Sequence, residues 1–315
     1  MALIIALILV ALATILATKL SFDVWIERQR TAGVLATEQA LHFAMGGEAL
    51  AADVLSHGQS GGPDTLADSW AQPTQPIPLT SDNTPDGEPL GTLQGTLEDM
   101  QGRFNLNSLL RVLPNGKPDP FPLEQFQRLL VSVGLEPKWA GIARDWVDAD
   151  DVPGIPDGAE DAVYTSQIPP YRAGNWPMTS PSELMALPGF GADRYRKIAP
   201  YVTALPSATA AINICTAPAE VLESLAESLN GEYSGNPDFL SKGRKSGCFP
   251  ELATFRNILG QVAAAKLAGR FGDKTSYFQL TTRVVIGNSE FTWYSLLQRS
   301  TGGKVTPLLR TFGSN

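Results

Sequence analysis

The first seventeen residues of the chain form a continuous apolar run. This run, MALIIALILVALATILA, contains no charged side chain, and the first charge is that of Lys19. A helix over it is apolar on every face, and its length is at the lower end of the about 17–25 apolar residues that span a bilayer. The run is too long for the core of a cleavable signal peptide, and no basic segment precedes it. We therefore predict that residues 1–18 form a membrane-spanning helix.

From Lys19 to about residue 56 the apolar residues recur at helical spacing, with charged residues between them. The apolar positions are Leu20, Val24, Leu35, Leu41, Ala44, Met45, Leu50 and Val54. Such spacing is typical of an amphipathic helix. The first proline is Pro63, so nothing interrupts the helix before it. Residues 19–56 are thus predicted to continue the first helix and to pack against a globular domain.

The next segment, residues 57–95, is rich in Gly, Pro, Ser and Asp and is predicted to be a surface connector. Within it, Trp70 is expected to anchor the connector to the body, because an indole ring is costly to leave in water. Residues 95–106 alternate weakly between apolar and polar and are predicted to form one strand.

Residues 108–272 contain a series of helical patterns. They are LEQFQRLLVSVGL, KWAGIARDWVDA, SPSELMAL, DRYRKIAPYVTAL, TAPAEVLESLAESL, FPELATFRNILG and GQVAAAKLAGRF. Ser180 and Thr216 are predicted N-caps, because their hydroxyls accept hydrogen bonds from the free N–H groups of a first helical turn. Gly134 is expected just past the end of the first of these helices.

After Lys274 the pattern changes to strands. YFQLTTRVVIG and FTWYSLLQRS are rich in β-branched and aromatic residues, Gly287-Asn288 lies between them, and VTPLLRTFG supplies a last short strand. The predicted fold is α+β. A long N-terminal helix packs on an antiparallel sheet, and the discontinuous outer domain (57–107 and 273–315) is interrupted by a large all-α insertion (108–272).

The composition narrows the functional classes. The net charge is −8 with a pI near 4.9, which argues against a general nucleic-acid binder. The two histidines, His42 and His57, lie outside the insertion, so no histidine is available there for zinc or for a nucleophile–base pair. We expect a protein that is not an enzyme. Cys215 and Cys248 both follow the predicted anchor in the sequence. If the anchor places them in an oxidising compartment, we expect a disulfide between them, and the alternative is two buried thiols.

An acidic segment, DWVDADDVPGIPDGAEDAVY, carries the most concentrated chemistry of the chain. Its carboxylates are Asp145, Asp148, Asp150, Asp151, Asp157, Glu160 and Asp161. Carboxylates this close repel one another unless a cation lies among them, and an all-oxygen ligand set suits Ca²⁺. We predict a structural Ca²⁺ site, first with Asp148, Asp150, Glu160 and Asp161 and then with Asp157 and Asp151. It is not an EF-hand, because Pro153 and Ala159 stand where that loop needs Gly and Glu; the alternative is a solvated acidic loop.

Several stretches resemble a known family. The MALII start followed by an amphipathic helix resembles type IV pilins and type II secretion pseudopilins. GRFNLNSLL, DWVDADD with GAEDAVY, YRAGN, SELMALPGF and NICTAPAEVL, in this order, resemble the K-type minor pseudopilins of type II secretion. The resemblance covers essentially the whole chain. It implies a single-pass subunit of the bacterial inner membrane with its soluble domain in the periplasm, and calcium in the helical domain.

The same resemblance implies partners and processing. The partners are the I- and J-type minor pseudopilins of a tip complex, the major pseudopilin and a prepilin peptidase. The peptidase removes a short leader and methylates the new N-terminal amine, which is that of Met1 if Met1 is the mature first residue.

Position five differs from the pattern of most pseudopilins, which have Glu there, whereas this chain has Ile5. In the resembled family that Glu pairs with the N-terminal amine of the subunit above. A subunit with Ile5 lacks this partner, and we predict that it occupies the tip, where nothing lies above it. The alternative is that Ile5 is neutral and other contacts hold the subunit.

A rival function comes from LPGFG between two helical patterns, which resembles a helix–hairpin–helix, and from INICTAPAEVLESL, which resembles the start of such a module in DNA-uptake proteins. Arg194, Arg196 and Lys197 would favour DNA, whereas Glu183, Asp193 and the acidic chain disfavour it. We expect no nucleic-acid partner.

Overall fold

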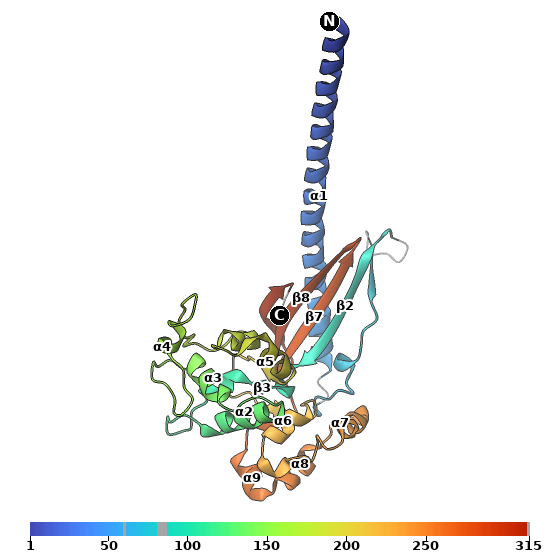
Figure 1. Cartoon of the computed structure of the whole chain (residues 1–315). Helices are drawn as coiled ribbons and strands as arrows, with labels where there is room; N and C mark the ends of the chain where they lie inside the picture. The colour runs from blue at the N-terminus through green and yellow to red at the C-terminus, as the bar shows by residue number, and fades with distance from the viewer. Residues whose placement is uncertain (59–60, 81–86, 314–315) are drawn as a thin grey trace.

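The computed structural model describes residues 1–58, 61–80 and 87–313. Its first element is α1 (Ala2–His57), one uninterrupted helix of 56 residues, as predicted. It ends at Gly58, whose N–H donates to the carbonyl of Val54. The N-terminal half projects away from the body (Figure 1). Among the described residues, α1 is the one helix long and apolar enough to cross a membrane, and the side chains of its apolar stretch are exposed.

The sheet has five antiparallel strands in the order β1-β2-β7-β8-β9. They are β1 (Ile77–Thr80), β2 (Pro89–Asp99), β7 (Tyr277–Ile286), β8 (Ser289–Arg299) and β9 (Val305–Phe312). Ile286 pairs with Ser289, so Gly287 and Asn288 form a two-residue turn, and the positive φ of 56° at Gly287 suits such a turn. The predicted hairpin and last strand are therefore confirmed.

The C-terminal part of α1 packs on one face of the sheet. Its buried apolar positions are small or lie at the end of the helix, including Ala40, Ala44, Ala51 and Leu55. A Cβ on Gly47 would lie 3.2 Å from Thr282, so the absence of a side chain there lets the helix approach β7 closely. The connector adds the 3₁₀ turn η1 (Ser69–Ala71), in which Trp70 is buried with its ring 5.2 Å from that of Phe278. The predicted anchoring role of Trp70 is confirmed.

The insertion between β2 and β7 is mainly helical and lies at the end of the body away from the N-terminus (Figure 1). Its α-helices are α2 (Pro120–Ser132), α3 (Trp139–Val147), α4 (Asp161–Tyr164), α5 (Gly191–Ile198), α6 (Ala219–Ser224), α7 (Pro237–Gly243), α8 (Leu252–Leu259) and α9 (Gln261–Lys266). Its 3₁₀ turns are η3 (Leu106–Leu110), η4 (Pro181–Ala186), η5 (Ala199–Tyr201), η6 (Glu227–Leu229) and η7 (Arg244–Ser246), and η2 (Met100–Gly102) precedes them after β2.

Two short parallel strand pairs tie the two ends of the insertion to its interior. β3 (Phe104–Asn105) pairs with β4 (Val202–Thr203), and β5 (Ile212–Asn213) pairs with β6 (Phe271–Gly272). Phe104 and Phe271 belong to the insertion's own hydrophobic core. That core therefore begins at Phe104, a few residues before the predicted boundary at 108.

Several predicted elements need correction. The first long strand runs over Pro89–Asp99 rather than 95–106, and the connector contains β1. The pattern DRYRKIAPYVTAL is helical only to Ile198 in α5 and then passes through a 3₁₀ turn containing Pro200 into β4, since a proline ring cannot continue the helix hydrogen bonds.

The two predicted caps had different outcomes. Ser180 caps η4 in a capping box with Glu183, as predicted, and Gly134 has a φ of 72° beyond α2. Thr216 is not an N-cap, because Pro218 precedes α6. Its hydroxyl donates instead to Asp99 at 2.6 Å.

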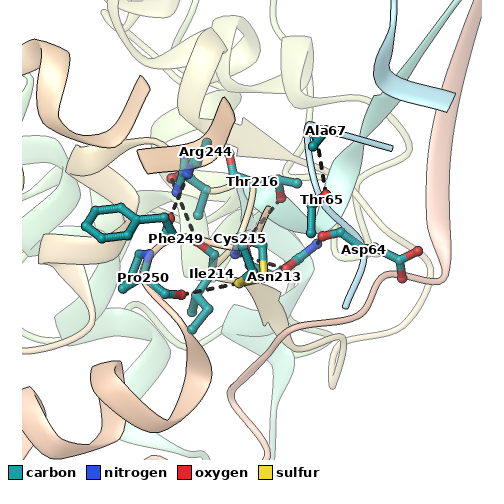
Figure 2. The surroundings of a disulfide bond; sticks show 12 residues. Asp64, Thr65, Ala67, Asn213, Ile214, Cys215, Thr216, Arg244, Phe249 and Pro250 are labelled. Atoms are coloured by element: carbon teal, nitrogen blue, oxygen red, sulfur yellow. Dashed lines mark hydrogen bonds between the residues drawn. A yellow bond between two sulfur atoms is a disulfide. The ribbon is translucent and has the colours of Figure 1, made fainter. Parts of the chain in front are cut away.

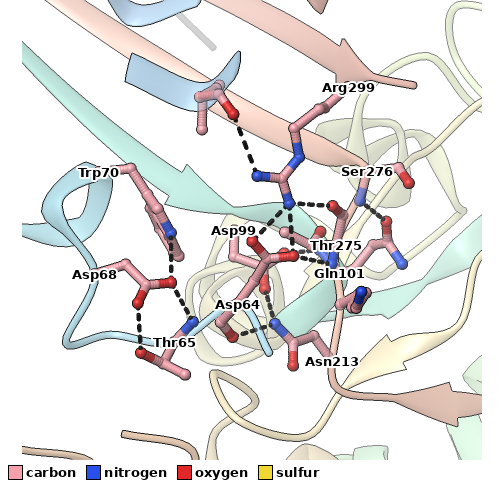
Figure 3. Close-up of polar contacts among 12 residues, drawn as sticks. Asp64, Thr65, Asp68, Trp70, Asp99, Gln101, Asn213, Thr275, Ser276 and Arg299 are labelled. Atoms are coloured by element: carbon pink, nitrogen blue, oxygen red, sulfur yellow. Dashed lines mark hydrogen bonds and ion pairs between the residues drawn. The ribbon is translucent and has the colours of Figure 1, made fainter. Parts of the chain in front are cut away.

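A buried polar cluster joins the end of α1, the sheet and the insertion (Figure 3). Arg299 donates to both carboxylate oxygens of Asp64 at 2.6 Å and to the carbonyl of Leu55 at 3.4 Å. On the insertion side, the Asn213 amide donates to the carbonyl of Asp64 at 3.0 Å and to the carboxylate of Asp99 at 2.8 Å. This cluster ties the insertion to the helix–sheet body.

Candidate metal centre

Three of the predicted calcium ligands converge between α3 and α4. One carboxylate oxygen from each of Asp148, Asp150 and Glu160 lies within 4.8 Å of the others. Asp148 follows the end of α3, and Glu160 is the N-cap residue of α4, so two helix ends and the loop between them form the group. Glu160 is buried, Asp148 is half-buried and Asp150 is exposed, which leaves the group open to solvent on one side.

The loop folds around Asp145, which sequence reasoning included in the acidic run but did not select. Its side chain is fully buried, and its Oδ2 accepts the N–H of Gly154 at 2.8 Å and that of Ala159 at 2.9 Å. A Cβ on Gly158 would lie 2.1 Å from the nitrogen of Gly154 and 2.3 Å from Asp145 Oδ2. Only glycine fits at position 158. In the sequence, Gly154 and Gly158 are the feature that indicates a loop closing tightly on a side chain.

Several buried carboxylate oxygens in this group lack a hydrogen-bond partner within the described residues. They are Asp145 Oδ1, Asp148 Oδ1 and both carboxylate oxygens of Glu160. Among the described residues, the cation within 4.0 Å of Asp145 and Asp148 is Arg144, whose Nε lies 4.0 Å from each carboxylate. Buried charges without partners are costly, so the group needs a further cation or protons.

The pKa values of two of these carboxyl groups reflect the same cost of burial and of repulsion between like charges. Burial, followed by the charges of Asp150 and Asp145, raises the pKa of Asp148 to about 6. Burial and the four neighbouring aspartates raise the pKa of Glu160 to about 7. A hard divalent cation with oxygen ligands would relieve both the desolvation and the repulsion.

The other predicted ligands lie outside this group. Asp151 accepts the side-chain amide of Asn175 at 3.0 Å. Asp161 accepts the N–H of Ala173 at 3.0 Å and lies 3.6 Å from Arg172. Asp157 is exposed. The geometry thus favours Asp148, Asp150 and Glu160, with Asp145 supporting the loop.

In the hairpin that suggested DNA binding, basic side chains bond to the hairpin itself or to a nearby carboxylate. Arg194 donates to the carbonyl of Gly189 at 2.9 Å and to that of Phe190 at 3.2 Å, and its guanidinium lies over Trp139. Arg196 pairs with Asp193. Two of the three basic residues are therefore engaged with the hairpin or with a local carboxylate, and the DNA-binding alternative has no support.

The predicted disulfide is confirmed: Cys215 and Cys248 are bonded across a separation of 33 residues. Arg244 lies in the loop between them and donates to the carbonyls of Ile214 and Phe249 (Figure 2). It also donates to the carbonyl of Ala217. Burial lowers the pKa of this guanidinium to about 10. At the other end of the chain, Met1 and Ile5 are exposed on the free part of α1.

Known proteins with the same sequence pattern identify the family. The family model "Type II secretion system (T2SS), protein K" matches residues 102–207. Type II secretion system protein K of Pseudomonas aeruginosa is 35% identical over 99% of this chain and 92% of its own length. The protein of the same name from Klebsiella pneumoniae is 32% identical over 95% of this chain and 91% of its own length.

A solved structure shares the fold. A chain of the crystal structure of the GspK-GspI-GspJ complex from enterotoxigenic Escherichia coli superposes with a TM-score of 0.76 and 24% identity, over 91% of this chain and 100% of that chain. Helix, sheet and insertion thus recur together in a solved protein. Taken with the sequence matches, they show that the chain belongs to the type II secretion system protein K family and has the role of a minor pseudopilin.

Proposed function

We propose that this minor pseudopilin occupies the tip of a short periplasmic pseudopilus, where it initiates and caps assembly for the export of folded proteins across the outer membrane. Its first helix anchors it in the bacterial inner membrane, and its soluble domain lies in the periplasm. The role is structural rather than catalytic. The observation that carries the proposal is the apolar residue at position five.

Ile5 supports a terminal position for an electrostatic reason. In a bundle of parallel pilin-like helices each N-terminal amine is charged, and burying it without a partner is costly. Ile5 offers no carboxylate to an amine above it. At the tip no subunit lies above, and an apolar side chain is the less costly residue in lipid.

The shape of the body supports the same position. The insertion extends beyond and beside the sheet (Figure 1). Repeated at every helical step of a filament, it would collide with the neighbouring subunits. A single copy at the end of the filament avoids the collision.

The proposed partners are the I- and J-type minor pseudopilins beneath it, followed by the major pseudopilin. The fold match to a chain from a GspK-GspI-GspJ complex supports the first two. A prepilin peptidase would act on the N-terminus and methylate the new N-terminal amine, which is that of Met1 if Met1 is the mature first residue.

We further propose that Asp148, Asp150 and Glu160 hold a structural Ca²⁺. The support is the convergence of three carboxylates around buried oxygens without partners. The ion would neutralise the loop and fix α4 against α3. Asp145 would keep the loop closed through its two backbone hydrogen bonds.

The tip position can be tested by labelling the soluble domain with gold in overproduced pseudopili. We expect label at one end of each filament. Ile5→Glu supplies the missing carboxylate but keeps the bulky insertion, so we expect isolated label within the shaft and no neighbouring labelled copies. Ile5→Leu should leave the label at the end. Label along the shaft in the wild type would overturn the tip position.

The calcium site can be tested by calorimetric titration of the full chain in detergent. We expect saturable Ca²⁺ binding that Glu160→Gln abolishes. Asp157→Asn should retain it, because Asp157 is an acidic residue of the same loop that lies outside the cluster. Absence of binding to the wild type, or equal binding to Glu160→Gln, would contradict the site.

A further inference from the structure

Two aromatic side chains follow the apolar run of α1. The rings of Phe22 and Trp25 are stacked with centroids 6.1 Å apart. Both are exposed, at 57% and 56%. The pair continues the exposed apolar surface of the run before it, and a contiguous exposed apolar surface marks a site of contact with another protein or with a membrane.

The body of the protein does not supply that contact. The buried residues of α1 begin at Ala40, far along the helix from Trp25. Within the described part of the chain, the indole N–H of Trp25 has no hydrogen-bond acceptor. The aromatic pair therefore lies between the membrane-spanning run and the packed end of the helix.

The depth of the pair can be estimated from the helical rise. At about 1.5 Å per residue, a hydrocarbon core of about 30 Å takes up about twenty residues, and each headgroup layer takes up about three to five more. Counted from Ala2, the core ends near Ser21, and the headgroup layer covers the next residues. Phe22 then lies at the boundary of the core, and Trp25 lies within the headgroup layer.

The charges are consistent with this depth. Lys19 lies within one helical turn of the boundary, so its ammonium group can reach the headgroups along its flexible stem. Asp23 and Glu27 lie beyond the estimated boundary, and a carboxylate in the hydrocarbon would be costly.

We propose that Phe22 and Trp25 bind the phospholipid headgroup layer and set the depth of the chain in the bilayer. The occupant of this exposed helix surface is the membrane that α1 spans, because the pair continues directly from the apolar run. Trp and Tyr gather at such interfaces, where an indole ring meets lipid while its N–H stays hydrated. This inference rests on the membrane anchoring in the proposed function.

The test is lipid quenching of tryptophan fluorescence. The full chain is reconstituted in vesicles of phosphatidylethanolamine and phosphatidylglycerol, in which a fraction of the acyl chains is brominated either near the headgroup or near the chain end. Trp25 is one of 6 tryptophans, so we expect a loss of up to about one sixth of the emission with bromine near the headgroup and less with bromine near the chain end. Trp25→Phe should remove this loss.

The control is Trp176→Phe, because Trp176 is 73% exposed on the insertion, far along the chain from the anchor. This variant should retain the quenching. Equal quenching of the wild type and Trp25→Phe, in chains that float with the vesicles, would overturn the headgroup contact and leave the anchor standing. A chain that does not float with the vesicles would overturn the anchor as well.

Discussion

The helix–sheet body and the acidic loop of the insertion bury carboxylates in two different ways. In the helix–sheet body, the Glu48 carboxylate accepts a hydrogen bond from Arg310 at 2.6 Å and another from the hydroxyl of Ser295 at 2.6 Å. The Asp64 carboxylate forms an ion pair with Arg299. In the insertion, the buried oxygens of Asp148 and Glu160 have no such donors among the described residues. The body carries its counter-charges in its own sequence, whereas the acidic loop does not, and we propose that a cation from solution takes their place.

The pKa directions separate the two regions in the same way. Although burial opposes it, the hydrogen bonds from Arg310 and Ser295 and the charge of Arg310 together lower the pKa of Glu48. Burial and neighbouring carboxylates raise the pKa of Glu160 to about 7. Four experiments test this contrast.

The largest effect is expected from removing a counter-charge inside the body. Arg299→Met leaves the Asp64 carboxylate buried and unpaired, and breaking a buried pair costs about 3–5 kcal/mol. Urea unfolding monitored by circular dichroism should show this loss. Arg283→Met is the matched control, because its pair with Glu290 is exposed and screened by solvent, so its loss should change the free energy of unfolding far less. Equal losses in both variants would remove the distinction between buried and exposed pairs.

The second effect is stabilisation of the insertion by Ca²⁺. At a free concentration of one hundred times Kd, a ligand that binds only the folded state contributes about 2.7 kcal/mol. A thermal melt should show a higher midpoint in Ca²⁺ than in EDTA. A midpoint that does not change across millimolar Ca²⁺ would contradict an external counter-charge at this loop.

The third effect is a gain of stability from a substitution, whereas most substitutions lower stability. In EDTA, Glu160→Gln removes a carboxylate that is repelled by its neighbours, and we expect it to stabilise the protein by about 1 kcal/mol, near the lower end of the cost of an unsatisfied buried group. In Ca²⁺ the same variant should be less stable than the wild type, because it has lost a ligand. Urea midpoints in the two buffers would show the crossing, and a loss of stability in both would refute the repulsion.

The smallest effect is a dependence on pH in EDTA. A carboxylate whose pKa is higher in the folded than in the unfolded state makes folding bind protons. For Asp148 and Glu160, stability should therefore rise as the pH falls from about 7, the folded value for Glu160, to about 4.5. Glu48 acts in the opposite direction, since its contribution is lost as the pH falls below its ordinary value of 4.5. Melting midpoints measured from about pH 7 to below pH 4.5 should thus pass through a maximum near pH 4.5, which Glu160→Gln should flatten.

The sequence predicts the parts of the fold whose signals are local. The apolar run and the absence of proline before Pro63 indicate α1, and Gly287-Asn288 between β-rich segments indicates the hairpin. The start of β2 is missed because Pro89 and Gly91 are typical of loops, whereas the strand forms through its pairing with β7. At Gly91 a Cβ would lie 1.7 Å from the carbonyl oxygen of Val285, so the glycine serves that strand contact.

The acidic site is predicted only in outline. Spacing along the chain identifies a run of carboxylates, but it cannot show that Asp161 turns toward Arg172 or that Asp151 meets Asn175, because these partners follow later in the sequence. Asp145 is missed because its role depends on two backbone N–H groups that the loop presents only after it has closed. The folded backbone of the loop, rather than its composition, determines that Asp148, Asp150 and Glu160 come together.

The uninterrupted α1 also has a mechanical consequence. Its 56 residues, at about 1.5 Å each, make a rod about 84 Å long without a proline hinge. A helix without a hinge transmits a displacement along its axis from its N-terminal end to the body, and a rotation about its axis turns the insertion with it. The segment between Trp25 and Ala40 is about 20 Å long and lies between the apolar run and the part of the helix that packs on the sheet, so it would couple the proposed membrane anchor to the body.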